Sequence, residues 1–336
     1  RQLIDAYIVG FEIQMALGRG VNWSHYNVGW HSTSTIIEIG SAGACARLLG
    51  LERSGVAHAL SLATSMACGP KAQFGSMAKS FHAGLAAQHA VTSAQLAEVG
   101  LEGRMEVLEA PMGFLELFGG NFPPGWEIAL DGFGDTLAIL EHGVVPKRHP
   151  CCASTHKCLD AVIDLRNEHG FMPDEIESVH TTVGSSNARN LSYADPQNDR
   201  EAKFSMQYCL ALGLLQDHLR IDDFAPEAIF RPEVRELIPR ITMTAFPVEA
   251  ERAPTPPDHE VIIHLKDGRE FKTTRSHPRG TIHDPLDAAD RQAKYIDCVT
   301  GKLDNKAANA LQDLLATFET IEDLGAIMKF LQFDAS

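Results

Sequence analysis

The residue pattern changes near Pro146, and this change limits the folds open to the chain. Before it, small helix-forming residues, chiefly Ala, Gly and Leu, recur in residues 34–50, 56–68 and 82–99. We interpret these stretches as helices that pack closely through their small faces. After it, strand-like runs alternate with helical runs, and prolines mark the turns. The pattern predicts a mainly α protein with an α+β part, namely an all-helical large domain plus a smaller α+β lid domain.

Four runs predict the strands of the lid: residues 178–183, 241–246, 260–265 and 270–274. The last two runs flank Lys266-Asp267-Gly268-Arg269, and Asp-Gly between alternating runs is the strongest short hairpin signal. We therefore expect an antiparallel sheet. Helices are expected beside it at residues 155–169 and 201–215.

The helical pattern returns after Pro285, in residues 287–300, 305–317 and 321–331. The simplest topology lets these helices rejoin the first domain and leaves the sheet as an insertion. We predict a helical domain of residues 1–145 and 285–336 and a lid of residues 146–284. The last helices should then pack against those before Gly134.

The charge balance restricts the partners of the chain. It has 44 acidic residues against 29 lysines and arginines, a net charge of −15, so its averaged field repels nucleic acid, anionic membranes and anionic substrates. An acidic ligand therefore needs a locally basic pocket. No apolar run approaches the roughly 18 residues of a spanning helix, and the start of the chain does not resemble a secretory signal. We expect a soluble, cytoplasmic protein without nucleic-acid or membrane partners.

The cysteines favour a reducing compartment and no metal. They are odd in number and scattered, unlike a small disulfide framework. The closest cluster with histidine, from Cys151 to Cys158, matches neither zinc nor iron–sulfur spacing. The seven are Cys45, Cys68, Cys151, Cys152, Cys158, Cys209 and Cys298.

Three segments concentrate polar groups that apolar packing does not explain. The first is Gly29-Trp30-His31-Ser32-Thr33-Ser34-Thr35, which leads into a helix. Ser32, Thr33 or Ser34 can cap that helix, and its free amides can hold a carboxylate with His31 at the mouth of the site. The alternative is that the hydroxyls only cap and His31 is a surface or core histidine. The following run Gly40-Ser41-Ala42-Gly43 lacks the nucleotide-loop pattern and favours close helix packing.

The second segment is Phe74-Gly75-Ser76-Met77-Ala78-Lys79-Ser80-Phe81-His82-Ala83-Gly84, a glycine-bounded loop that enters another helix. Lys79 and His82 put a cation and a proton carrier at one helix start, which suits a bound carboxylate. The alternative is a solvated Lys79 with His82 packed on the helix.

The third segment, residues 145–156, joins the two proposed domains. It carries Lys147, Arg148, His149 and His156, and ligand clefts favour domain junctions. Cys151 or Cys152 could act as a nucleophile there. No partner base is identified in the sequence, so a packed or idle thiol is the favoured interpretation.

These segments, in this order and at these distances, resemble the MmgE/PrpD family, which includes 2-methylcitrate dehydratase, cis-aconitate decarboxylase and iminodisuccinate epimerase. The resemblance extends over nearly the whole chain, and its specificity lies in the ordered set. It rests on residues 29–51, on Lys79-Ser80-Phe81-His82-Ala83-Gly84-Leu85-Ala86-Ala87, on Lys147-Arg148-His149-Pro150-Cys151-Cys152, on Phe204-Ser205-Met206-Gln207-Tyr208, and on Arg279-Gly280 ahead of Pro285-Leu286.

The resemblance implies a helical large domain, an α+β lid, a homodimer, and cofactor-free chemistry on di- or tricarboxylates. By position, His31 resembles a pocket histidine, Lys79 a pocket lysine and Lys147 a second substrate-facing lysine, so these three are the predicted catalytic residues. The predicted substrate-binding residues are Ser32, Thr33, His82, Arg148 and Cys152.

Two departures from the family pattern affect the functional prediction. Cys152 falls where cis-aconitate decarboxylase carries a pocket histidine, which argues against that activity. Nothing before His31 matches the family's Asp-rich N-terminal segment with its histidine, and the chain begins with Arg1, so we expect a fragment. We predict a hydro-lyase that dehydrates a hydroxylated, 2-methylcitrate-like acid after proton abstraction next to a carboxylate. The alternatives are an epimerase or decarboxylase of the same family, or a non-catalytic carboxylate-binding relative.

Overall fold

The computed structural model describes residues 1–22, 24–120, 125–251 and 253–332. The chain divides into two compact units, Arg1–Gly143 and Val144–Ser336. The described part of the first unit is helical, and the second unit carries one four-stranded sheet among helices. The predicted fold class, mainly α with an α+β part, is therefore confirmed.

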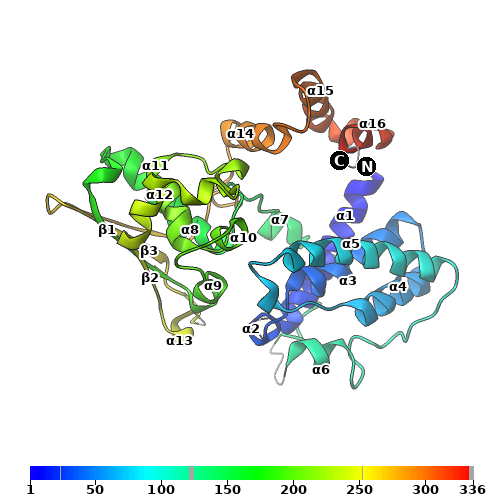
Figure 1. The fold of residues 1–336 in the computed structure, drawn as a ribbon. Coiled ribbons are helices and arrows are strands. Elements are labelled where there is room, and N and C mark those ends of the chain that lie inside the picture. The colour runs from blue at the N-terminus through cyan, green and yellow to red at the C-terminus, as the bar shows by residue number, and fades with distance from the viewer. Residues whose placement is uncertain (23, 121–124, 252, 333–336) are drawn as a thin grey trace. The chain divides into compact units, whose positions relative to one another are not determined.

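In the first unit, helices α3, α4 and α5 contact one another, and α1 packs on α3 (Figure 1). The predicted helices at 34–50, 56–68 and 82–99 are confirmed as α3, α4 and α5. The elements are α1 (Gln2–Val21), α2 (Ser24–Val28), η1 (Ser32–Ser34), α3 (Ile36–Leu48), α4 (Arg53–Met66), η2 (Lys71–Gln73), α5 (Met77–Glu98), α6 (Phe114–Gly119) and α7 (Ala138–His142).

Glycines let α1 and α3 approach at backbone distance. A Cβ atom added to Gly40 would lie 2.7 Å from the carbonyl oxygen of Gly10, and one added to Gly10 would lie 2.9 Å from that of Gly40. Real Cβ atoms do not come this close, so each glycine is required where the helices cross. Ala42 and Ala46 on α3 are fully buried. The interpretation of the Gly40-Ser41-Ala42-Gly43 run as a helix-packing feature is confirmed.

The second unit contains the four predicted strands, each within two residues of its predicted ends. Helices and short 3-10 turns connect the strands. In chain order the elements are α8 (Ala153–His169), η3 (Pro173–Glu175), β1 (Ile176–Val183), α9 (Ser185–Asn190), α10 (Asp199–Ala202), α11 (Met206–Leu215), η4 (Ile221–Phe224), η5 (Ala228–Phe230), α12 (Pro232–Leu237), η6 (Ile238–Arg240), β2 (Ile241–Ala245), α13 (Val248–Glu251), β3 (His259–Leu265), β4 (Glu270–Arg275), α14 (Ala288–Val299), α15 (Asn305–Ala316), η7 (Phe318–Thr320), α16 (Gly325–Met328) and η8 (Lys329–Leu331).

The sheet is mixed, with strand order β2-β1-β3-β4. The β3–β4 hairpin is confirmed, and its turn residue Gly268 has φ +90°, a conformation that favours glycine. The β1–β3 pair is also antiparallel. The β1–β2 pair is parallel, so the antiparallel prediction was wrong for this pair. Residues 184–240 form the long helical crossover that a parallel pair requires, and strand periodicity carries no information on direction.

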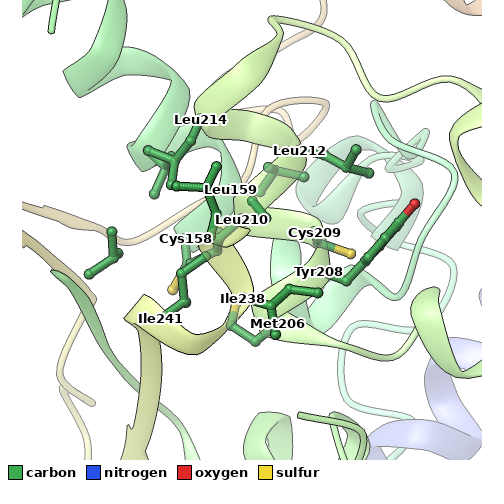
Figure 2. Close-up of a cluster of buried hydrophobic side chains, with 14 of the residues drawn as sticks. Cys158, Leu159, Met206, Tyr208, Cys209, Leu210, Leu212, Leu214, Ile238 and Ile241 are labelled. Carbon is green, nitrogen blue, oxygen red and sulfur yellow. The ribbon is translucent and has the colours of Figure 1, made fainter. Parts of the chain in front are cut away.

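The core of the second unit lies where α8 and α11 pack against the sheet. Helix α11 is buried from Met206 to Leu214, and its side chains meet Leu159 of α8 and Ile241 of β2 (Figure 2). A Cβ atom on Gly213 would lie 2.6 Å from the Leu159 Cδ1 atom, so the two helices also meet closely.

Two predicted helices are interrupted. The stretch 201–215 contains a break between α10 and α11, because the backbone of Ser205 is extended rather than helical. The Ser205 hydroxyl accepts a hydrogen bond from the Tyr208 amide at 3.1 Å and so caps the start of α11. The stretch 321–331 forms only the short pieces α16 and η8. Apolar spacing alone did not show these breaks.

The helices predicted at 287–300 and 305–317 are confirmed as α14 and α15. Residues 144–336, which include these helices, form one compact unit. That the last helices pack against those before Gly134 stays a prediction, as do the domain boundaries derived from it. Across the described ranges, none of the helices combines the length and apolar character needed to cross a membrane.

We predict that Gly40→Ala destabilises the protein, whereas Gly84→Ala does not. Gly84 lies in α5 with no atom within 4 Å of an added Cβ, so alanine there should stabilise the helix by up to about 1 kcal/mol. At Gly40 the overlap with α1 should cost about 1–3 kcal/mol. Chemical denaturation of both variants measures the difference, and equal stabilities would contradict the close-packing role of Gly40.

Candidate functional site

Two of the three polar segments lie in the first unit, where backbone pairing aligns residues 29–34 with residues 68–71. The His31 amide donates to the Gly69 carbonyl at 2.9 Å, and the Lys71 amide donates to the Gly29 carbonyl at 2.7 Å. Trp30 and Pro70 form an isolated β-bridge between these bonds. The pairing places His31 beside the first turns of α5, which carry the second segment.

His31 and His82 are in direct contact. Their Nδ1 atoms lie 3.2 Å apart, and the two residues are 7% and 8% exposed. One ring must donate the proton of this hydrogen bond and the other must accept it, because both atoms are of the same kind. The Phe74 ring meets the His31 ring edge-on, with centroids 5.1 Å apart. The structure thus brings together two residues that the sequence placed in separate segments.

The surroundings of His31 keep it neutral. Burial lowers its pKa most, followed by the positive charge of Lys79, the neighbouring His82 and Lys71, and together they bring the pKa to about 4. The Lys79 ammonium lies 5.1 Å from the centre of the Phe74 ring. A neutral imidazole can accept a proton at pH 7 without first losing one. A base and a cation therefore lie in one part of the first unit.

Sequence reasoning missed Lys71 and His25. The Lys71 ammonium lies 3.3 Å from the centre of the Tyr26 ring and donates to the Tyr26 carbonyl at 3.3 Å. His25 is fully buried, and its Nε2 atom is 2.9 Å from the Thr35 hydroxyl. Burial and, second, the charge of Lys71 lower its pKa to about 4. Neither residue belongs to a motif recognised in the sequence. Lys71 is brought near His31 only by the backbone pairing of residues 29–34 with residues 68–71.

The hydroxyl residues after His31 do not cap α3 as expected. Residues Ser32–Ser34 form a 3-10 turn, and the N-cap of α3 is Thr35, which makes no side-chain capping bond. The Ser34 and Thr35 hydroxyls instead donate to the His31 carbonyl at 3.1 and 3.2 Å. They therefore anchor the backbone of the histidine. The substrate-binding roles of Ser32 and Thr33 stay predictions.

The third segment is held in the second unit by Asp160, a fully buried residue of α8. Its carboxylate accepts hydrogen bonds from Arg148 at 3.3 Å, from His149 at 3.4 Å and from the Arg279 backbone amide at 2.8 Å. Burial by itself would raise the pKa of Asp160, but the bonds from His149 and Arg279 outweigh burial and lower it to about 2. Arg148 also pairs with Asp290 at 3.0 Å. The buried carboxylate thus ties residues 148–149 to residue 279.

The remaining predicted residues lie near this network. The Lys147 ammonium donates to the Cys151 carbonyl at 3.1 Å, and the Cys152 amide donates to the Lys203 carbonyl at 2.8 Å. Burial raises the pKa of Cys152. Cys151 is buried in the hydrophobic core. Burial alone would raise the pKa of its thiol, but hydrogen bonds with Cys209 and His156 and the charge of His156 lower it well below the usual value. Whether this thiol is idle stays a prediction. The structure does not test the roles of Lys147, Arg148 and Cys152, which stay predictions.

We predict that Asp160→Asn lowers the free energy of unfolding by about 2–4 kcal/mol, because it leaves buried cations without their counter-charge. The wild type should also lose stability as the pH falls from about 4 to 2, since the folded pKa of Asp160 lies below its unfolded value. The variant should lack that part of the pH dependence. Glu168→Gln, an exposed change on the same helix, is the control. Matching acid-unfolding curves for Asp160→Asn and wild type would contradict the anchoring role.

Comparison with known proteins agrees with the motifs. The N-terminal domain of the MmgE/PrpD family matches residues 1–127, and its C-terminal domain matches residues 149–320. The chain is 27% identical to human (Homo sapiens) cis-aconitate decarboxylase over 98% of this chain and 69% of that protein. It is 26% identical to the Aspergillus terreus cis-aconitate decarboxylase over 98% of this chain and 70% of that protein. The matched domains account for most of the sequence, and the chain therefore belongs to the MmgE/PrpD family.

Proposed function

We propose that the protein is a lyase that removes a proton next to a carboxylate of a small di- or tricarboxylic acid. The lead reaction is dehydration of a hydroxylated acid of the 2-methylcitrate type. The observation that carries this proposal is the buried His31, neutral at pH 7 and close to the cation of Lys79. A base and an electrostatic stabiliser are the two groups that such a proton abstraction requires.

In this mechanism His31 takes the proton from the substrate carbon, and the electron pair of the C–H bond moves toward the neighbouring carboxylate. The resulting enediolate-like charge is poorly stabilised in water. Lys79 stabilises that charge, and a well-placed donor contributes roughly 10²- to 10³-fold in rate. Lys147 is proposed as the second substrate-facing cation. Loss of hydroxide from the adjacent carbon then completes the dehydration, with a proton supplied to the departing oxygen by a second acid.

Decarboxylation is the second candidate, because the similar proteins are cis-aconitate decarboxylases. That reaction breaks a C–C bond to release carbon dioxide and then protonates the carbanion that is left, so it needs an acid and no base. A histidine with a pKa of about 4 is a base at pH 7, which favours proton removal. Cys152 in place of the pocket histidine of the decarboxylase argues in the same direction. An epimerase would share the first step and return the proton to the opposite face.

One panel of assays separates these reactions. The full-length protein is incubated in D2O with 2-methylcitrate, citrate, cis-aconitate and hydroxylated dicarboxylates. Dehydration yields an unsaturated acid, decarboxylation releases carbon dioxide from cis-aconitate, and epimerisation incorporates deuterium with inversion. Deuterium exchange together with dehydration supports the lead proposal. Thermal stabilisation by these acids without exchange or turnover would favour the non-catalytic relative and contradict a lyase.

We predict that His31→Gln lowers kcat by about 10²- to 10⁴-fold while KM changes much less, since Gln keeps a polar side chain but cannot transfer the proton. In the wild type, kcat/KM should stay level from pH 7 to 5 and fall with a midpoint near the His31 pKa of about 4. A bound carboxylate favours the imidazolium, so the midpoint for kcat should be higher. His142→Gln, at an exposed histidine, is the control. Turnover of His31→Gln within a few-fold of wild type would rule out the proposed base.

We predict that Lys79→Met and Lys147→Met each raise KM and lower kcat together, because both lysines are proposed to hold the acid and its developing charge. Lys79 lowers the His31 pKa, so Lys79→Met should also move the midpoint of the pH–rate profile upward. Steady-state kinetics across pH measures both effects. Lys306→Met changes an exposed lysine of α15 and is the control. A lysine variant with unchanged kinetics would remove that residue from the proposed site.

A further inference from the structure

We propose that His82 is a positioning residue that accepts the Nδ1 proton of His31 and so leaves the His31 Nε2 atom free to act as the base. This inference rests on the proposed function and adds a residue to it. The observation behind it is the 3.2 Å contact between the Nδ1 atoms of the two buried rings.

The proton shared between the His31 and His82 Nδ1 atoms can be on either ring. If His31 donates from Nδ1, its Nε2 atom is bare and can take a proton from carbon. If His82 donates instead, the neutral His31 carries its own proton on Nε2 and cannot act as the base. Proton abstraction by His31 therefore requires the first arrangement. After abstraction, the His31 imidazolium still donates from Nδ1 to His82, so the same bond stabilises the product of the step.

Both rings are held at this distance by their surroundings. The His31 backbone is fixed by its amide bond to Gly69 and by the hydroxyls of Ser34 and Thr35 on its carbonyl. A Cβ atom on Gly69 would lie 3.1 Å from the Nδ1 and Cε1 atoms of His82 and would overlap the Ser34 hydroxyl. Gly69 has φ +135°. The backbone at this glycine thus allows the approach of the His82 ring to His31.

A neutral hydrogen-bond partner suits the proposed base at His31 better than a carboxylate does. A carboxylate beside His31 would stabilise the imidazolium and hold a proton on the ring. His82 can orient the ring without adding a negative charge. With Lys79 nearby to keep His31 neutral, a second imidazole gives the base its orientation and leaves its basic atom empty. The rival role for His82 is direct contact with the substrate, the role predicted from the motif.

The test compares His82→Leu with His82→Asn in the full-length protein. Asparagine places an oxygen near the position of Nδ1 and keeps an acceptor for His31, whereas leucine removes it. Loss of the hydrogen-bond partner that orients a metal-bound histidine costs roughly 10- to 100-fold, and we take that range as the guide here. We expect that loss in kcat for the leucine variant, with KM within a few-fold, and rescue to within a few-fold of wild type by asparagine.

A second readout is independent of activity. In protein labelled with ¹⁵N-histidine, nitrogen NMR distinguishes protonated from bare ring nitrogens, and His31→Gln assigns the His31 signals. Wild type should show His31 protonated on Nδ1 at pH 7, and His82→Leu should shift protons toward Nε2. The matched control is His89→Leu, on α5 two turns beyond His82, whose Nδ1 atom contacts Glu38 at 3.1 Å. It should leave the His31 signals and kcat unchanged.

The outcomes separate the inference from the proposed function. Absence of turnover on every acid would defeat the proposed function, while a proton on His31 Nδ1 that depends on His82 would still support the positioning geometry. A wild-type His31 protonated on Nε2 would overturn the inference, even if His82→Leu did not fold. Equal losses in the leucine and asparagine variants with a large rise in KM would overturn it too, because His82 would then contact the substrate.

Discussion

The backbone pairing of residues 29–34 with residues 68–71 is the interaction on which the candidate site depends. It is short, yet it holds the His31 amide and brings His31 to the side of α5. The Ser34 and Thr35 hydroxyls hold the His31 carbonyl. Helices packed through glycine and alanine provide the rigid support for it, since α3 and α5 contact each other directly. His31 lies on a loop, but its backbone is held as firmly as that of a helical residue. Proton transfer from carbon would require such accurate positioning of the base.

The charges around His31 differ in sign from the net charge of the chain. The chain carries a net charge of −15, but the charged groups that act on His31 are the lysines at positions 71 and 79. Local cations and burial act in the same direction on the ring, because both disfavour the imidazolium. The same cations favour a bound carboxylate. In the proposed function, this one local arrangement would keep the base neutral and also attract an acidic substrate that the averaged charge repels.

Asp160 has the corresponding structural role in the second unit. A carboxylate with no exposure is stable only when it is fully hydrogen-bonded, and its partners come from residues 148, 149 and 279. Those positions lie in or beside motifs on which the family resemblance rests. Part of that resemblance thus reflects an internal ion network. This explains why residues such as Arg148 could be selected from the sequence without revealing whether they contact a substrate or only support the segment.

The sequence by itself determined the family, the helical character of the first half, all four strands and the Asp-Gly hairpin, because hydrophobic period and turn chemistry are local properties of the chain. It also singled out both members of the His31–His82 pair, but not their contact. Tertiary structure decided that contact, the presence of Lys71 near His31, the parallel β1–β2 pair and the break at Ser205. Each of these depends on which distant segments meet and in which direction, or on a cap that competes with helix continuation. Local periodicity carries no information on such long-range pairings.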